Sequence, residues 1–168
     1  KLRMCAEVFC YGEYIINRRG RANLVIGCSI EQSFFDCWGD LGRYTAAQII
    51  CEILDKITVE GADCKEELSL ALTALAAVSR AETSPYIIAA WYLSRVLLVI
   101  GRDIEDSAAP QRQKTLITSL ADMEVTDLDS LDITKGELRE ALGYLNLVLR
   151  DELSARINSL AEALKQDI

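Results

Sequence analysis

The chain has 168 residues, of which 51% are hydrophobic, with two prolines and nine glycines. This length and composition are typical of one folded domain, and they argue against disorder. Histidine is absent, which excludes Ser-His-Asp and Cys-His catalysis, and the formal net charge of −8 disfavours binding to phosphate backbones. We therefore expect a single helical domain over residues 1–168, for which nucleic acid is a disfavoured partner.

Residues 2–18 are predicted to form the first helix. Met4, Val8 and Ile15 recur at a helical spacing, and Arg18-Arg19-Gly20 gives a basic last turn followed by a glycine stop.

Residues 24–38 are expected to contribute a connector and a short helix. Leu24-Val25-Ile26-Gly27 has the composition of a strand, but a single strand would have no partner, so we interpret it as a packed connector. Ser29 with Gln32 is a capping-box signature for a short helix through about Trp38.

Three helices are predicted in the middle of the chain, over residues 45–59, 64–81 and 85–100. The third begins at Ser84-Pro85, ends before Gly101 and is apolar nearly all round. Its fifteen residues after the proline rise only about 23 Å, too short for a bilayer, and Arg95 lies inside it. We expect a central helix buried in protein and no transmembrane segment.

The C-terminal half is expected to hold a helix over about 110–121 and a long amphipathic one after it. Thr134 and Glu137 form a capping box for the second. Its apolar residues follow in steps that average about 3.7 residues, which favours one long straight helix or two helices bent near Arg150-Asp151 over a coiled coil. These apolar residues are Leu138, Leu142, Leu145, Leu149, Leu153, Ile157, Leu160 and Leu164.

Residues 103–132 are acidic, with eight Asp and Glu against Arg112 and Lys114. Two solvated loops that cap helix N-termini account for this pattern. The alternative is a docking surface for a basic partner.

All six cysteines lie in the first 64 residues, and no two have the spacing of a structural zinc knuckle. Most have apolar neighbours, so we expect reduced thiols in the core, no metal and no cofactor. A disulfide framework of a secreted protein is the alternative. The cysteines are Cys5, Cys10, Cys28, Cys37, Cys51 and Cys64.

Three short strings are similar to known motifs. Residues 127–138 begin like a calcium loop but lack its glycine and its final carboxylate. Asp129-Ser130-Leu131 resembles the phosphopantetheine attachment site of acyl carrier proteins, a family about half as long as this chain. Residues 35–43, with Trp38-Gly39 ahead of Arg43, are similar to the groove motif of the Bcl-2 family, but Asp40-Leu41-Gly42 interrupts the match.

Two sets of residues are the predicted binding sites. The narrow second half of the C-terminal stripe is a candidate partner surface, because an amphipathic helix can offer its apolar row to another molecule. Arg95 is a candidate anion anchor at the mouth of an apolar pocket, because a charge on an apolar helix needs a partner. The two sets are Leu153, Ile157, Leu160 and Leu164, and Trp91, Tyr92 and Arg95.

The sequence as a whole predicts an all-α bundle of six to eight helices around the central helix. We interpret it as a non-catalytic, intracellular protein-interaction module that binds a protein partner or itself, in a reducing compartment such as the cytoplasm. One alternative is a carrier that holds an apolar or acidic small ligand between helices. Another is an enzyme that uses carboxylate or cysteine chemistry.

Overall fold

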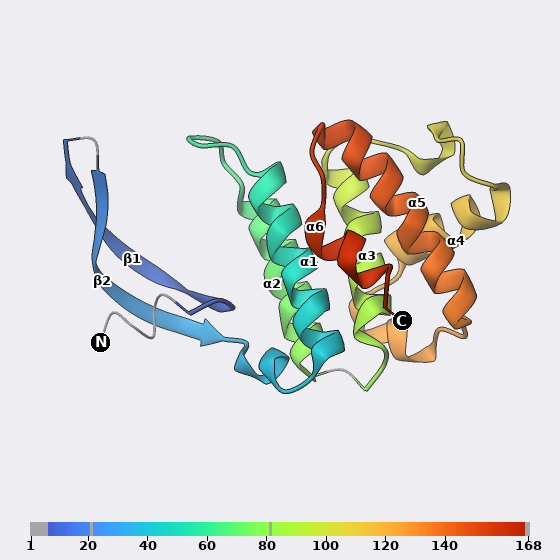
Figure 1. The fold of residues 1–168 in the computed structure, drawn as a ribbon, viewed down its shortest axis with the longest axis horizontal. Helices are drawn as coiled ribbons and strands as arrows, with labels where there is room; N and C mark the ends of the chain where they lie inside the picture. The colour runs from blue at the N-terminus through green and yellow to red at the C-terminus, as the bar shows by residue number, and fades with distance from the viewer. Residues whose placement is uncertain (1–6, 21, 81, 167–168) are drawn as a thin grey trace. The chain divides into compact units, whose positions relative to one another are not determined.

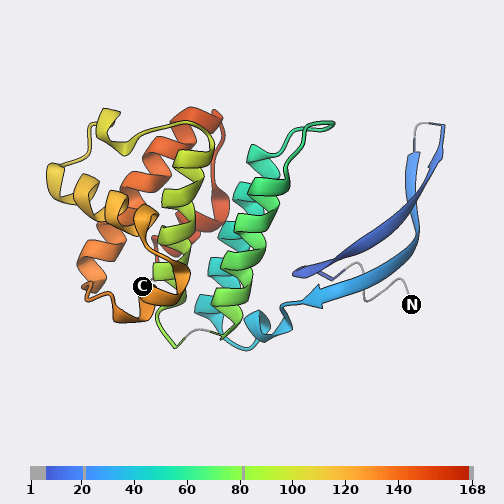
Figure 2. The same ribbon diagram turned by 180° about the vertical axis from the view of Figure 1, so that it is seen from behind.

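A computed structural model describes residues 7–20, 22–80 and 82–166, with the backbone alone for Arg19, Ala22 and Asp106. The chain divides into two compact units, residues 1–36 and residues 37–168 (Figures 1 and 2). The described part of the first unit is a β-hairpin, and that of the second unit is helical. The fold is therefore mixed, although mostly helical, and the prediction of an all-α protein is wrong.

The hairpin consists of β1 (Cys10–Arg19) and β2 (Ala22–Ser33), paired antiparallel. Arg19 lies opposite Ala22, and Gly20 in the turn has a φ of 60°, which glycine adopts without strain. The predicted first helix is a strand from residue 10 onward, and residues 2–6 of that prediction lie outside the described residues. The predicted connector at 24–27 is the strand's partner.

β-branched and aromatic side chains explain why this segment is a hairpin. Tyr14-Ile15-Ile16 and Leu24-Val25-Ile26 favour strands and flank a glycine-containing turn, whereas the helical spacing in residues 2–18 was coincidental. Gly12 fixes one irregularity in the register, because a Cβ there would lie 2.2 Å from the carbonyl oxygen of Ser29.

The second unit contains six α-helices among its described residues, together with short 3₁₀ helices. Their starts and ends follow the sequence signals closely from α2 onward, whereas α1 begins at Leu41, four residues before the predicted start at residue 45, because Asp40 and not Thr45 caps it. The predicted helix at 29–38 is wrong, because β2 continues to Ser33 and only Phe35–Trp38 forms a 3₁₀ turn. The α-helices are α1 (Leu41–Ile57), α2 (Lys65–Arg80), α3 (Pro85–Val99), α4 (Gln111–Asp122), α5 (Lys135–Leu153) and α6 (Asn158–Ala163).

Helix α3 is the centre of the helical unit. It contacts α1 and α2 as well as α4 and α5, and the ribbon shows it between these two pairs (Figure 1). Eleven of its fifteen residues are buried. The buried central helix predicted at 85–100 is thus confirmed. No helix among the described residues is long and apolar enough to cross a membrane.

The C-terminal segment is two helices, which agrees with the bent alternative. Thr134 and Glu137 form the predicted capping box at the start of α5. Helix α5 ends where Ser154 adopts the left-handed conformation, with a φ of 47°. Glu52 of α1 then accepts hydrogen bonds from the backbone N–H groups of Asn158 and Ser159, which attaches the start of α6 to α1.

Burial of α3 predicts a large cost for truncating its core side chains. Leu97 is 2% exposed, so Leu97→Ala removes buried methyl groups and leaves a cavity, at a cost of about 2–5 kcal/mol. Leu98→Ala is the matched control, because Leu98 is 54% exposed and should cost less than about 1 kcal/mol. Urea unfolding of both variants measures the difference. Equal losses would contradict the placement of α3.

Candidate functional site

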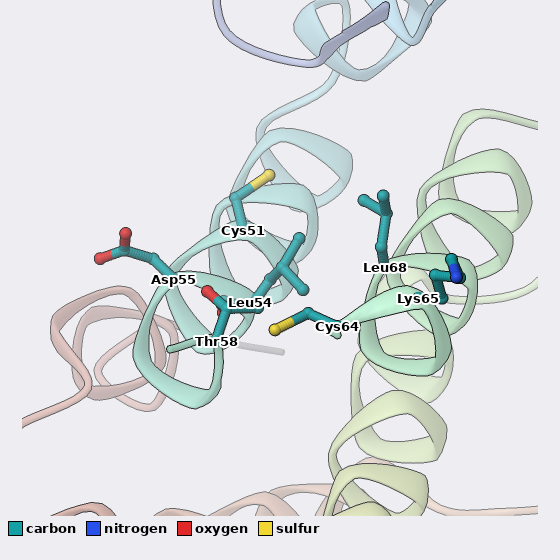
Figure 3. A pocket seen from close by; sticks show the side chains of 7 residues that line it. All are labelled: Cys51, Leu54, Asp55, Thr58, Cys64, Lys65 and Leu68. Atoms are coloured by element: carbon teal, nitrogen blue, oxygen red, sulfur yellow. The ribbon is translucent and has the colours of Figure 1, made fainter. Parts of the chain in front are cut away.

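An apolar pocket of about 510 Å³ lies between the end of α1 and the start of α2. Leu54 and Leu68 are half-buried and turn toward the space between the two helices, whereas Asp55 and Lys65 point away from it (Figure 3). Helix α1 ends at Ile57 and α2 begins at Lys65, so both helices present their last or first turn to the pocket. The lining residues are Cys51, Leu54, Asp55, Thr58, Cys64, Lys65 and Leu68.

Polar groups around the pocket are largely satisfied by local partners. The Thr58 hydroxyl donates to the carbonyl oxygen of Leu54 at 2.9 Å. Lys65 pairs with Asp63, with 3.1 Å between Nζ and Oδ2. The free surface of the pocket is therefore apolar, which suits an aliphatic or aromatic group better than a charged one.

Two reduced thiols, Cys51 and Cys64, line the pocket. Burial, and secondarily the neighbouring Cys37, raises the pKa of the Cys51 thiol to about 11. Cys51 is therefore protonated at neutral pH and is a poor nucleophile. Cys64 is half-buried beside the carbonyl oxygens of Val59 and Ala62, and its sulfur points toward α1 (Figure 3). Asp55 is the carboxylate among the lining residues, and it points away from the pocket and from both thiols (Figure 3).

The prediction that the cysteines are reduced thiols in the core holds only in part. Cys37 is fully buried, but Cys10, Cys51 and Cys64 are half-buried. Cys28 is disulfide-bonded, so the expectation that every cysteine is reduced is wrong. Cys5 lies outside the described residues. Within the described ranges, no cluster of His, Cys, Asp and Glu side chains could hold a metal ion.

Trp91 and Arg95 lie together at a second pocket of about 370 Å³ between α2 and α3. The Trp91 Nε1 and the Arg95 Nη2 each donate to the carbonyl oxygen of Met123 at 2.9 Å. The guanidinium also lies 5.5 Å from the Trp91 ring centroid and 3.7 Å from a Glu124 carboxylate oxygen. Arg95 thus serves to hold the end of α4, and its charge already has a carboxylate partner.

Tyr92, the third residue of this predicted site, lies elsewhere. Its side chain is fully buried and lines none of the pockets described above, and its hydroxyl has no hydrogen-bond partner among the described residues. Burial, with a smaller contribution from Cys51, raises the pKa of that hydroxyl. Tyr92 is a core residue of α3 rather than a ligand contact.

The predicted partner surface on the C-terminal stripe is largely inside the molecule. Ile157 and Leu160 are fully buried, and Leu153 and Leu164 are half-buried. Helix α6 packs on α1 and α5, which is what covers this row. In the isolated chain these side chains are therefore not available as a docking row.

Sequence reasoning missed the pocket between α1 and α2. The helical spacing assigns the apolar side chains at the two helix ends to the core stripe of each helix. One signal in the sequence could have pointed to this region. Val59 is a bulky apolar residue in the loop between the end of α1 and Gly61, and it is exposed in the structure.

Comparison with known proteins gives one partial similarity. The chain is 27% identical to the DNA repair protein RecO of Acetivibrio thermocellus over 95 residues, which make up 56% of this chain and 38% of that protein. The chain thus spans less than half the length of this relative. No known family profile matches the chain, and no solved structure matches it.

This similarity overturns the expectation that nucleic acid is disfavoured as a partner. Nucleic acid was disfavoured because of the net charge of the whole chain, but the charged residues are unevenly distributed along it. Residues 37–168 carry 13 Lys and Arg against 22 Asp and Glu, whereas residues 1–36 carry five against four. Arg18 and Arg19 end β1, and Arg21 follows Gly20 in the sequence, so three of those five lie within four consecutive positions of an otherwise acidic chain.

Burial of the C-terminal stripe predicts the result of a charge substitution there. Ile157→Asp places an unpaired carboxylate at a 0% exposed position and should cost more than about 3 kcal/mol, enough to lower Tm by roughly 10 °C or to unfold the chain. Leu147→Asp, on the exposed face of α5, should leave Tm nearly unchanged. Circular dichroism melting distinguishes them. An Ile157→Asp protein that stays folded with an unchanged Tm would show that this row is exposed at the surface.

The two pocket thiols should differ sharply in reactivity. N-ethylmaleimide at pH 7.5 should alkylate Cys64 at least about tenfold faster than Cys51, since the raised pKa of Cys51 keeps it protonated. The rate at Cys51 should continue to rise as pH approaches 11, because the thiolate fraction grows until the pKa is passed. Peptide mass spectrometry of wild type, Cys51→Ser and Cys64→Ser assigns each rate. Equal rates at both sites would contradict the assigned burial.

Proposed function

We propose that this chain is a non-catalytic binding module that acts in DNA repair, and that its helical unit takes an apolar side chain of a protein partner into the pocket between α1 and α2. The similarity to RecO supplies the process, because the name of that relative states DNA repair. The pocket supplies the mode of binding, because it is open, apolar and large enough for an aromatic or branched side chain.

The lining of the pocket favours binding over chemistry. Cys51 is protonated at neutral pH, and the carboxylate of Asp55, which lines the pocket, points away from Cys64 (Figure 3). The exposed Val59 directly follows the lining residue Thr58, and its carbonyl oxygen lies near the Cys64 sulfur, so it adds an apolar side chain next to the lining residues. A small apolar ligand held in the same pocket is the alternative occupant.

A photo-crosslinking experiment tests the partner proposal. Benzoylphenylalanine introduced at Val59, which is exposed and directly follows the lining residue Thr58, should crosslink a protein partner in an extract of the source cells, and mass spectrometry should identify a protein that handles DNA. Leu68→Trp fills the pocket and should abolish this crosslink. Leu98→Trp is the matched control, because it adds the same bulk on an exposed position of α3 and should leave the crosslink intact.

Two results would count against this proposal. A crosslink that survives Leu68→Trp would show that the pocket is not the docking site. A native mass spectrum of the purified protein with a small molecule bound, lost in Leu68→Trp, would favour the carrier alternative.

The basic hairpin turn supports a second candidate function, contact with nucleic acid. Arg18 is exposed at the end of β1, and Arg19 and Arg21 are its neighbours in the sequence. Phosphate contacts by such residues provide affinity without sequence preference. The helical unit, with its excess of carboxylates, would not take part in this contact.

Fluorescence anisotropy with labelled single-stranded and duplex oligonucleotides tests this second function. Binding should weaken as salt increases, and Arg18→Glu should weaken it several-fold. Arg80→Glu reverses the same charge on the exposed end of α2 and should have less effect. Equal losses in both variants would indicate a response to net charge alone and would reject the turn as the contact.

The proposed cellular location follows from the proposed process. A protein that acts in DNA repair works in the compartment that holds the DNA. The reduced thiols of Cys51 and Cys64 fit a reducing compartment, whereas the disulfide at Cys28 does not.

A further inference from the structure

A groove runs along α2 on a face that does not line the pocket with α1. Two cavities, of about 370 and 460 Å³, share Thr73 of α2 and Val125 of the 3₁₀ helix η4 (Val125–Ser130) as lining residues, so they form one groove. We call it the α2–η4 groove. Its lining on α2 extends from Glu66 to Arg80, which is about 21 Å along the helix axis. Buried side chains of α3 form its floor.

Contacts within the helical unit hold the walls of this groove. Trp91 and Arg95 of α3, which line it, both donate to the carbonyl oxygen of Met123, two residues before η4. Leu128 of η4 is 1% exposed, so this turn is anchored in the core. The α2–η4 groove is therefore preformed, which reduces the ordering cost that a ligand has to overcome on binding.

The α2 wall has a shape that suits another helix. Ser69, Thr73, Ala76 and Ala77 line the groove at spacings of four, three and one, so they share one face of α2. Side chains of this size let a second helix approach to an interaxial distance of about 8 Å. An extended peptide binds through main-chain hydrogen bonds to a strand edge, but the backbone groups of α2 are already bonded within the helix. A helix brings its own backbone hydrogen bonds and needs none from the wall.

Carboxylates border the groove on both walls. Glu66 of α2 and Asp129 of η4 line it and are exposed, and among the described residues neither takes part in an ion pair. Glu124 also lines it and is 77% exposed. Residues 115–134 contain no lysine or arginine, so the η4 wall carries negative charge alone. These borders favour a cationic ligand.

Two arginines also line the groove without neutralising it. Arg95 lies 3.7 Å from a Glu124 carboxylate oxygen and is used to bind the end of α4. Arg80 lies at the end of α2, remote from the acidic first turn of that helix. Asp127 on η4 and Glu67 on α2 add further negative charge beside the lining residues. The groove as a whole is therefore apolar at its floor and acidic along its borders.

We propose that the α2–η4 groove binds an amphipathic helix of a partner protein, with lysine or arginine on both sides of the apolar row of that helix. The apolar row packs on Ile88 and Trp91, which are buried side chains of the floor. The basic side chains reach Glu66, Glu124 and Asp129 on the borders. A second copy of this chain is a poor occupant, because its helical unit carries 22 Asp and Glu against 13 Lys and Arg. This site is separate from the pocket between α1 and α2 and does not depend on its function.

Fluorescence anisotropy with a designed peptide tests the kind of partner. The probe is a labelled helix of leucine, alanine and lysine, about four turns long to match the groove, with lysines on both sides of one leucine row. It should bind the full chain, and the same peptide with glutamate in place of every lysine should bind at least about tenfold more weakly. Equal binding of both peptides, or binding of neither, would overturn the proposal.

A matched pair of threonines tests the place of binding. Thr73 on α2 and Thr115 on α4 are both exposed, and each hydroxyl donates to the carbonyl oxygen four residues earlier. Thr73→Trp fills the middle of the groove and should weaken binding of the lysine peptide at least about tenfold, whereas Thr115→Trp should leave it unchanged. Peptide affinity that survives Thr73→Trp would place the site elsewhere and overturn the proposal.

Charge variants keep the proposal testable if Thr73→Trp disturbs folding, which circular dichroism reports. Asp129→Lys should weaken binding of the lysine peptide several-fold, and Asp151→Lys, at an exposed position of α5, is the control with the same change in net charge. Equal losses in both variants would indicate a response to net charge alone and would refute the groove. Sedimentation that shows self-association of the wild-type chain, lost in Asp129→Lys alone, would assign the groove to a second copy and overturn the choice of partner.

Discussion

The fold of the helical unit depends on the burial of one helix, α3 (Pro85–Val99). Because α3 is apolar nearly all round, it cannot lie on a surface, and four other helices cover it. Two polar side chains of α3 connect it to the end of α4. Trp91 and Arg95 both donate to the carbonyl oxygen of Met123, which fixes the end of α4 to the centre of the unit. This use of Arg95 explains why a cation persists within an otherwise apolar helix.

The peripheral helices follow from this centre, and they determine which surfaces remain for binding. Helix α6 is only six residues long, and Glu52 of α1 accepts hydrogen bonds at its first turn. Burial raises the pKa of Glu52, but the hydrogen bonds from Ser159 and Asn158 outweigh it and lower the pKa below its usual range. With α6 fixed in this way, the apolar row through Ile157 is covered, whereas the pocket between α1 and α2 stays open.

The sequence predicts most of the helical unit but does not predict the hairpin. From α2 onward, capping residues, Pro85 and glycine stops act locally, so they mark helix ends without knowledge of the tertiary structure. A strand depends on a partner, and the apolar residues near Ile15 match a helical spacing by chance. The Arg18-Arg19-Gly20 string was read as a helix end, although a glycine between two strands gives the same signal. The pocket was missed for a related reason, because Leu54 and Leu68 come together only when α1 and α2 pack.

The central claim is that the chain combines a self-sufficient helical unit around α3 with a two-stranded hairpin, which is at best marginally stable by itself. Hydrogen exchange of the full chain, followed by mass spectrometry at a concentration low enough to prevent association, tests both parts at once. The account predicts that α3 amides exchange only through global unfolding, while the amides of β1 and β2 exchange orders of magnitude faster. Hairpin protection equal to that of α3 under these conditions would contradict the account, as would rapid exchange within α3.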